Sequence, residues 1–182
     1  MSSSAGHGTT GNSRIDVLIS EADLRERVKA LGAQITRDFA GRSLVVVGVL
    51  KGSFVFLADL VRAIDLPVLV EFIGISSYEG TSTTGVVRIT SDLGRPIGGK
   101  DVLLVEDIVD TGLTMRYLLD NFATRDPASV EVCALLEKPA RARVTIPIRY
   151  RGFVIGDEFV VGYGLDWDGR MRNLPFVGVP RT

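Results

Sequence analysis

One stretch decides the fold: Val102-Leu103-Leu104-Val105-Glu106-Asp107-Ile108-Val109-Asp110-Thr111-Gly112-Leu113-Thr114-Met115. It opens with a continuously apolar run, residues 102–105, which is typical of a strand covered on both faces in a parallel sheet. Ligands of open α/β sheets bind beyond the carboxyl ends of the strands. We therefore expect the three acids Glu106, Asp107 and Asp110 to stand at a binding edge.

Three acids within five residues repel one another unless a cation or a hydroxyl-rich group binds them. A metal-bound or sugar-bearing ligand would supply such groups. The segment from Asp110 to Thr114 adds two hydroxyls, a glycine and backbone amides before a helix with the apolar residues Met115, Leu118, Leu119 and Phe122. A helix start of this kind binds phosphate. The alternative is an ordinary polar turn and helix cap, which would have no need of clustered carboxylates.

The strand, the acidic pair, the third acid and the Thr-Gly-x-Thr turn together resemble the phosphoribosyl pyrophosphate (PRPP) motif of type I phosphoribosyltransferases, in the form found in hypoxanthine-guanine phosphoribosyltransferases. The resemblance extends from about residue 43 to the C-terminus. It implies an α/β fold with a mainly parallel central sheet flanked by helices, and a small hood subdomain. It also implies transfer of the 5-phosphoribosyl group from magnesium-bound PRPP to nitrogen 9 of hypoxanthine or guanine, with xanthine left open, yielding IMP or GMP and pyrophosphate.

Composition narrows the function classes. The chain has 182 residues, 46% hydrophobic and 24% charged, which suits one globular domain. A net charge of -1 gives no basic footprint for nucleic acid or a membrane surface. The only histidine, His7, lies in a polar tail, so histidine triads and the usual zinc sites are excluded. Cys133 lies in an apolar run and is expected to be a buried thiol.

We expect a cytoplasmic protein, because the sequence shows neither a secretory leader nor a run of 18 apolar residues. Residues 1–13 are small and weakly hydrophobic, and we predict that they are disordered. Residues 14–182 should form one domain, with the hood built from its N-terminal part and about residues 150–182. The glycines Gly6, Gly8 and Gly11 match a dinucleotide motif, but no strand precedes them and no helix follows directly. A P-loop motif is absent from the sequence.

Apolar periodicity predicts the other elements. A helix should begin near Ser20 and end near Gly41, with its apolar face at Leu24, Val28, Leu31, Ile35 and Phe39. Strands are predicted at Leu44–Leu50, Val68–Ile75, Val86–Ile89, Val130–Leu136, Phe153–Gly156 and Phe159–Gly164, and a helix at Phe54 to Val61.

The first predicted strand runs into Lys51-Gly52-Ser53. A cation and a glycine at the end of a strand indicate an anion site. The segment resembles the family's Leu-Lys-Gly loop, which contacts the pyrophosphate of PRPP, often through a cis peptide. A lysine placed there for solubility is the alternative.

Residues 76–85 (SSYEGTSTTG) are too polar for a core and read as a loop between two strands. Such a loop could act as a lid that excludes water. Ser77 and Tyr78 resemble the Ser-Tyr pair of the family's flexible catalytic loop. An ordinary hairpin loop is the alternative.

Lys138 follows another apolar strand, and a lysine can donate hydrogen bonds but accept none. The resemblance implies that it reads the 6-oxo group of the purine. The resemblance further implies that Phe159 stacks on the base, that Val160 contacts it through backbone groups, that Asp166 ligates magnesium beside the purine and that Arg172 contacts pyrophosphate. Without the resemblance, Lys138 would be read as a surface lysine, Phe159 as a core residue and Asp166 as part of a solvated turn.

The resemblance assigns the remaining roles to the deciding stretch. Glu106 and Asp107 would hold the ribose hydroxyls and Mg²⁺, and the turn Asp110, Thr111, Gly112, Leu113 and Thr114 would cradle the 5-phosphate. Asp110 is the candidate that exchanges a proton with nitrogen 7. Leu113 departs from family members that carry lysine there, although backbone amides can still bind phosphate. The resemblance also implies a homodimer or homotetramer. A PRPP- or nucleotide-sensing regulatory protein on the same fold is the alternative function.

Overall fold

A computed structural model describes residues 9–10, 13–78 and 86–181 of the chain. Within these residues, six strands form the main sheet, in the order β5-β4-β3-β6-β7-β8. All neighbouring pairs are parallel except β4 with β5. The strands span Leu44–Leu50 (β3), Leu69–Tyr78 (β4), Val86–Ser91 (β5), Asp101–Val109 (β6), Ser129–Glu137 (β7) and Ile148–Val154 (β8). The predicted mainly parallel α/β architecture is confirmed.

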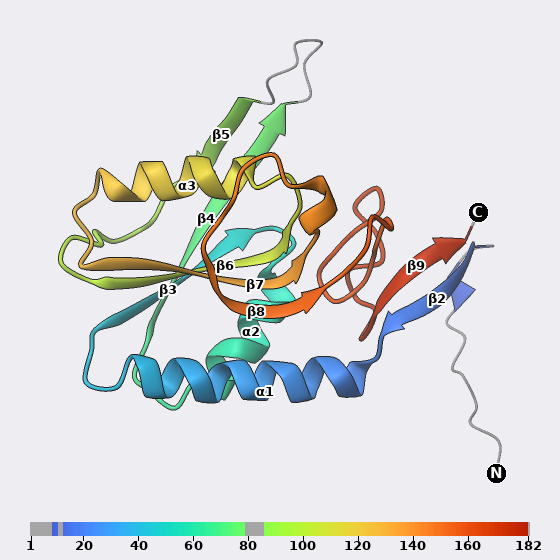
Figure 1. The fold of residues 1–182 in the computed structure, drawn as a ribbon, viewed down its shortest axis with the longest axis horizontal. Helices are drawn as coiled ribbons and strands as arrows, with labels where there is room; N and C mark the ends of the chain where they lie inside the picture. The colour runs from blue at the N-terminus through green and yellow to red at the C-terminus, as the bar shows by residue number, and fades with distance from the viewer. Residues whose placement is uncertain (1–8, 11–12, 79–85, 182) are drawn as a thin grey trace.

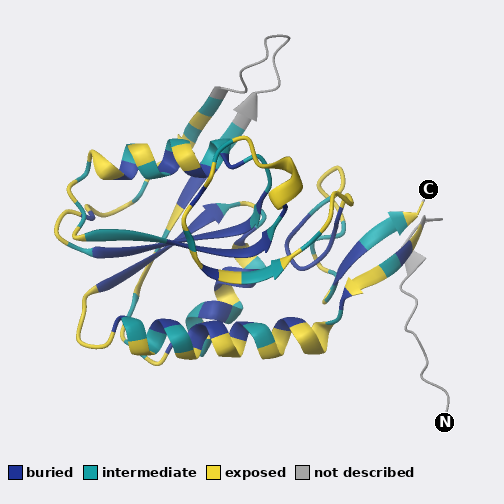
Figure 2. Ribbon diagram, viewed as in Figure 1, coloured by how far each residue is buried: buried dark blue, intermediate teal, exposed yellow. Residues whose placement is uncertain are grey.

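Helices cover both faces of this sheet (Figure 1). Helices α1 (Glu21–Asp38) and α2 (Phe54–Ala63) lie on one face, and α3 (Leu113–Ala123) lies on the other. Alternate residues of β3 point to opposite sides, so Leu44 and Val46 pack toward α1 and α2 while Val45 packs toward α3. The strands at the centre of the sheet are consequently buried on both faces (Figure 2).

Helix α1 begins where the sequence predicts. The Ser20 hydroxyl accepts a hydrogen bond from the Asp23 backbone N–H at 3.1 Å, which caps the helix. A Cβ atom on Gly32 would lie 2.4 Å from the Ala63 carbonyl oxygen, so a glycine there lets α1 approach the end of α2 closely. None of the helices in the described part of the chain is both long and apolar enough to cross a membrane.

A second, smaller sheet joins the two ends of the chain (Figure 1). Its strands are β1 (Thr9–Thr10), β2 (Ser13–Ile19) and β9 (Val177–Arg181), in the order β1-β2-β9. The expectation of disorder over residues 1–13 is therefore wrong for Thr9, Thr10 and Ser13, which pair as strand residues. Residues 1–8 and 11–12 lie outside the described residues.

Four strand predictions need correction. The strand predicted at Phe153–Gly156 lies at Ile148–Val154 (β8), so it begins five residues earlier. Strand β6 continues to Val109, so Glu106 and Asp107 belong to the strand and do not follow it. Strand β4 continues to Tyr78, because its pairing with β5 extends the hairpin beyond the predicted end at Ile75. The segment from Phe159 to Gly164 is not a strand, since only isolated bridges at residues 161 and 162 pair within it.

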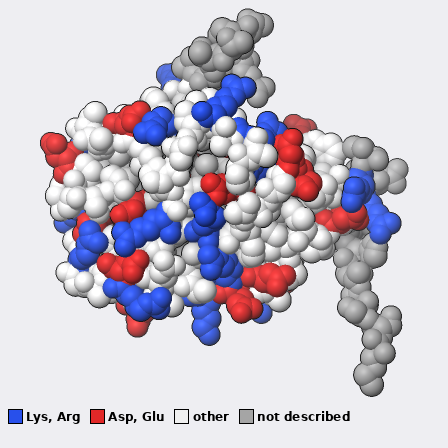
Figure 3. Space-filling view, viewed as in Figure 1, with Lys and Arg blue, Asp and Glu red and all other residues white. Residues whose placement is uncertain are grey.

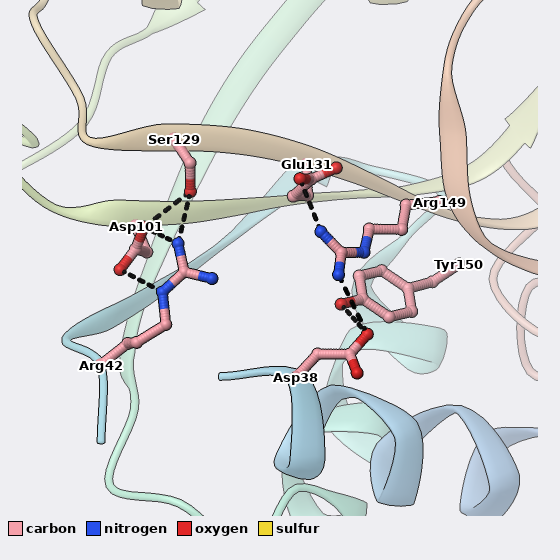
Figure 4. Close-up of polar contacts among 7 residues, drawn as sticks. All are labelled: Asp38, Arg42, Asp101, Ser129, Glu131, Arg149 and Tyr150. Atoms are coloured by element: carbon pink, nitrogen blue, oxygen red, sulfur yellow. Dashed lines mark hydrogen bonds and ion pairs between the residues drawn. The ribbon is translucent and has the colours of Figure 1, made fainter. Parts of the chain in front are cut away.

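Polar contacts lie at the end of the sheet where the parallel strands start, opposite the end at which β6 leads into residues 110–114 (Figure 4). Arg42 Nε donates to Asp101 Oδ2 at 2.9 Å, and the Ser129 hydroxyl donates to Asp101 Oδ1 at 2.6 Å. Beside them, the Tyr150 hydroxyl donates to Asp38 Oδ2 at 2.9 Å. Figure 4 also shows Arg149 between Asp38 and Glu131. These contacts join the starts of β6 and β7, and the end of α1 to β8.

Candidate active site

The turn between β6 and α3 takes the form that the sequence predicts. Gly112 caps α3 with φ +80°, and a Cβ atom on it would lie 2.7 Å from the Val144 carbonyl oxygen. Both the backbone angle and the close contact therefore favour glycine. The Thr111 hydroxyl oxygen accepts a long hydrogen bond, 3.4 Å, from Leu113 N–H. The predicted residues from Asp110 to Thr114 thus form one turn that leads into a helix N-terminus.

The acidic pair stands on opposite faces of β6, as expected for successive strand residues. Glu106 faces the turn of residues 110–114 and lines a small pocket there together with Asp110, Thr111, Gly112 and Thr114. Asp107 faces the other way, toward Gly52. Both acids are buried, with exposed fractions of 7% and 8%.

Burial perturbs the acid–base behaviour of the pair. It raises the pKa of Glu106 well above the usual range of a glutamate, and the neighbouring Asp107 carboxylate raises it further. Burial also raises the pKa of Asp107, against the lowering effect of hydrogen bonds from Glu106 and from the Ile108 N–H. Two buried acids side by side disfavour their ionised forms. They form a site that a ligand bringing hydroxyl groups or a divalent cation would stabilise.

The Lys51-Gly52 loop meets the acidic pair. The Leu50-Lys51 peptide is cis, and Lys51 is exposed at the end of β3. A Cβ atom on Gly52 would lie 1.6 Å from Asp107 Oδ2, and one on Gly164 would lie 2.1 Å from the Gly52 carbonyl oxygen. Gly52 is therefore enclosed between β6 and the C-terminal segment, and the predicted pyrophosphate loop adjoins the predicted ribose acids.

Arg172 and Asp166, both predicted ligand contacts, bind each other here. Arg172 Nη2 lies 2.7 Å from Asp166 Oδ1, and its Nη1 donates to the Gly164 carbonyl at 2.6 Å. The Arg172 charge also acts to lower the pKa of Asp107. Within the described residues no three acidic, His or Cys side chains gather as metal ligands. Glu106, Asp107 and Asp166 thus do not form one protein cage.

The predicted purine residues lie beside the turn of residues 110–114. Lys138 is 5% exposed, its N–H donates to the Val109 carbonyl, and its Nζ donates to the Glu158 carbonyl at 2.6 Å. The next residue, Phe159, is 55% exposed and packs edge-on against Trp167 with ring centroids 6.1 Å apart. The structure therefore brings a buried ammonium group and an exposed aromatic ring together near the turn.

Residues 21–168 of this chain match the phosphoribosyl transferase domain family. The chain belongs to this family. It is 52% identical over 168 residues to a hypoxanthine phosphoribosyltransferase of Haemophilus influenzae, covering 90% of this chain and 94% of that one. It is 48% identical over 168 residues to a hypoxanthine-guanine phosphoribosyltransferase of Dictyostelium discoideum, covering 90% and 93%.

Solved structures agree with this phosphoribosyl transferase assignment. A crystal structure of a hypoxanthine-guanine phosphoribosyltransferase of Bacillus anthracis, with a HEPES molecule in its active site, superposes with a TM-score of 0.88. The two sequences are 49% identical, and the match covers 94% of this chain and all of the other. The type I phosphoribosyltransferase fold of this chain is therefore established.

The predicted flexible-loop residues of this phosphoribosyl transferase are only partly placed. Ser77 and Tyr78 form the last residues of β4, where they pair with Val87 and Val86 of β5. The prediction that they belong to a loop is therefore wrong for their backbone. Their side chains, and residues 79–85, lie outside what the structure describes.

Sequence reasoning missed two residues of this phosphoribosyl transferase site. Gly164, at φ +103°, packs on Gly52, and Arg141 Nε lies 2.8 Å from Asp110 Oδ1. Both contacts join segments that are far apart in the chain. An arginine in the run Pro139-Ala140-Arg141 reads locally like any surface cation, so no signal in the sequence marks it.

Proposed function

We propose that this chain transfers the 5-phosphoribosyl group of PRPP to nitrogen 9 of hypoxanthine or guanine, forming IMP or GMP and pyrophosphate. One observation carries the proposal: the turn from Asp110 to Thr114 lies beside the buried ammonium of Lys138 and the exposed ring of Phe159. A phosphate cradle and a site for an oxopurine thereby adjoin. The names and identities of the relatives support the same reaction.

The reaction makes a bond from nitrogen 9 to carbon 1 of the ribose and breaks the bond from that carbon to pyrophosphate. The bonding electron pair leaves with pyrophosphate, so negative charge grows there while the sugar becomes cationic. Lys51 and Arg172 are the cations we assign to the pyrophosphate. The turn residues Asp110, Thr111, Gly112, Leu113 and Thr114 bind the 5-phosphate through backbone amides and hydroxyls.

We assign Mg²⁺, arriving with PRPP, to the carboxylates Glu106 and Asp107. Mg²⁺ prefers hard oxygen ligands and usually takes one or two carboxylates together with waters and substrate phosphates. The two acids fit this preference, because they are buried oxygen donors whose charged forms are disfavoured by burial alone. The metal would offset charge on the phosphates. We also assign Asp166 to Mg²⁺, directly or through water, after release from Arg172.

The base is recognised by the residues that follow β7 and β8. The Lys138 ammonium donates to the 6-oxo group, Phe159 stacks on the ring and the Val160 backbone meets its edge. Adenine carries an amino group at position 6. This group and the Lys138 ammonium are both hydrogen-bond donors, so they cannot pair, and adenine is rejected. As nitrogen 9 bonds to the ribose, the proton on nitrogen 7 passes to the Asp110 carboxylate.

The proposal extends to further parts of the molecule. The small sheet of β1, β2 and β9 would be part of a hood over the base. Cys133, the one cysteine, is a buried free thiol, which fits a cytoplasmic protein. We also propose that the chain forms a homodimer or homotetramer.

The regulatory alternative has no support among the relatives, which are named for catalysis. A sensor that binds RNA would use a basic face. On the face shown in Figure 3, basic and acidic side chains are interspersed. The enzyme is therefore the function we propose, without nucleic acid or membrane as partners.

The proposal is tested by offering hypoxanthine, guanine, xanthine and adenine separately with PRPP and Mg²⁺ and measuring nucleotide formation. We expect nucleotide from hypoxanthine or guanine and none above background from adenine. Adenine used as well as the oxopurines would remove the role of Lys138. No product from any base would overturn the enzyme assignment.

A further inference from the structure

One short segment, residues 138–144, runs along the outside of the phosphate turn. The Lys138 N–H donates to the Val109 carbonyl at 3.0 Å. The N–H groups of Arg143 and Val144 both donate to the Thr111 carbonyl, at 2.9 and 3.3 Å. The segment that carries the purine lysine therefore also holds the backbone on both sides of Asp110.

Arg141 lies in the middle of this segment and reaches Asp110 with its side chain. Its Nε lies 2.8 Å from Asp110 Oδ1. That oxygen is shielded from solvent yet has no aligned hydrogen-bond donor, so charge attraction is what holds it beside the guanidinium. Within the described residues, Oδ2 of Asp110 takes part in no hydrogen bond or ion pair of its own. The ion pair, in which 47% of the Arg141 side chain and 37% of the Asp110 side chain are exposed, thus restrains one carboxylate oxygen and leaves the other available.

The same guanidinium also reaches the purine side of the site. Arg141 Nη1 lies 3.3 Å from Asp157 Oδ1, and Asp157 belongs to the segment that leads from β8 to Phe159. Both partners of this second pair are well exposed, so it adds little energy. It does place Arg141 between the proton-accepting carboxylate and the segment that carries the stacking aromatic.

We propose that Arg141 is a positioning residue of this enzyme, which orients the Asp110 carboxylate toward the purine without touching either substrate. The proposal rests on the proposed function, because Asp110 needs an orientation only if it takes the proton of nitrogen 7. An aspartate side chain on a turn can adopt several rotamers, and misplacement of a reacting group by about 1 Å can reduce a rate about 100-fold. A guanidinium at 2.8 Å from one carboxylate oxygen restricts that freedom.

The first test compares Arg141→Gln, Arg141→Lys and the wild type in steady-state assays with hypoxanthine and PRPP. We expect Arg141→Gln to lower kcat about 10- to 100-fold while the KM values for PRPP and hypoxanthine change less than about 3-fold. Arg141→Lys keeps the charge and should recover part of kcat. Arg143→Gln is the matched control, because this neighbouring exposed arginine supplies only its backbone N–H to the contacts described above.

The second test asks whether Arg141 acts through Asp110. In the Asp110→Asn background, adding Arg141→Gln should lower kcat by less than about 2-fold, since residues that act as one unit are not additive. An equal loss in both backgrounds would overturn the proposal. So would an unchanged kcat in Arg141→Gln, or a KM for PRPP raised with kcat intact, which would mean direct phosphate binding. A wild type that makes no nucleotide would instead overturn the proposed function.

Discussion

Gly52 is the residue at which the parts of the site meet most closely. A side chain there would collide with the Asp107 carboxylate on one side, and Gly164 touches the Gly52 carbonyl on the other. Three segments are thereby held in contact: the loop that follows β3, strand β6 and the segment that follows residue 160. The candidate site depends on the absence of a side chain at Gly52 as much as on the charged groups around it.

Replacing Gly52 by alanine should therefore disable the enzyme. We expect Gly52→Ala to lower kcat/KM for PRPP by about 100-fold or more, because either the loop or the Asp107 carboxylate has to move. Steady-state kinetics at varied PRPP would measure this. Gly98→Ala is the control, since its Cβ would meet only the Arg125 carbonyl oxygen at an ordinary 3.6 Å. Full activity in Gly52→Ala would show that the loop is not held as described.

The ionised side chain of Glu106 destabilises the folded protein at neutral pH. Its pKa is raised on folding, so ionisation opposes the folded state at pH values above the glutamate's unfolded pKa of about 4.3. Glu106→Gln should then be more stable than the wild type at pH 7, by about 1 kcal/mol, or about 2 to 4 °C in Tm. The gain should disappear near pH 3 to 4, where the glutamate is protonated in both states.

Thermal unfolding without PRPP, at pH 7 and at pH 3 to 4, measures the effect of Glu106→Gln on Tm. The exposed Glu26→Gln is the control. The same Glu106→Gln protein should bind PRPP more weakly. A lower Tm than the wild type at pH 7 would contradict the account of the buried pair.

At the scale of elements, the two ends of the central strands differ in purpose. The carboxyl ends of β3, β6 and β7 carry the candidate site, whereas the start of β6 carries the ion pair of Asp101 with Arg42 (Figure 4). The hydrogen bond from Arg42 holds the pKa of Asp101 below its usual range. This end of the sheet is therefore stabilised by ionised Asp101, far along the strand from the chemistry.

Asp101→Asn should accordingly destabilise the fold and spare the reaction. Because the folded pKa is depressed, the stabilisation is present above the unfolded pKa and is lost as pH falls through the folded one. We expect a loss of about 1 kcal/mol at pH 7, limited by the 39% exposure of the Arg42 side chain. The difference from wild type should shrink below about pH 4. Urea unfolding at pH 7 and below pH 4 measures the difference in stability, with the exposed Asp65→Asn as control. An equal difference between Asp101→Asn and the wild type at both pH values would contradict this account of Asp101.

The elements also show what local sequence can predict. Strands β3 and β6 and the turn after β6 were predictable, because continuous apolar runs and the Asp110 to Thr114 pattern act locally. Strands β2 and β9 were not, because β2 mixes polar and apolar residues, β9 contains Pro180, and each is stabilised by pairing with the other end of the chain. The apolar segment from Phe159 to Gly164 reads as a strand, but positive φ angles at Gly162, Tyr163 and Gly164 bend it out of extended form.

At the scale of the whole molecule, the face of β4 beyond α2 is apolar and uncovered. Phe54 of α2 is 44% exposed, and Val70 and Phe72 of β4 are 41% and 43% exposed. Val70 and Phe72 share one face of β4, and Phe72 lies near Gly48 on the side where Leu57 of α2 packs. Exposed apolar patches of this kind mark interaction surfaces, and this one suits the proposed homo-oligomer.

Phe72→Glu should therefore shift the oligomer toward monomer, because a carboxylate would be buried in the interface. Light scattering coupled to gel filtration would measure the mass. Lys29→Glu also places a carboxylate at an exposed position, on α1, and should leave the mass unchanged. If Phe72→Glu keeps the mass of the wild type, the interface lies elsewhere.

The central claim is that phosphoribosyl transfer to a purine takes place at the carboxyl end of β6. Its most direct test is the kcat of IMP formation from hypoxanthine and PRPP in the wild type, Asp110→Asn and Asp120→Asn, the last being an exposed aspartate of α3. The account predicts that Asp110→Asn loses about 10²- to 10⁴-fold in kcat while Asp120→Asn matches the wild type. An Asp110→Asn protein as fast as the wild type would contradict it.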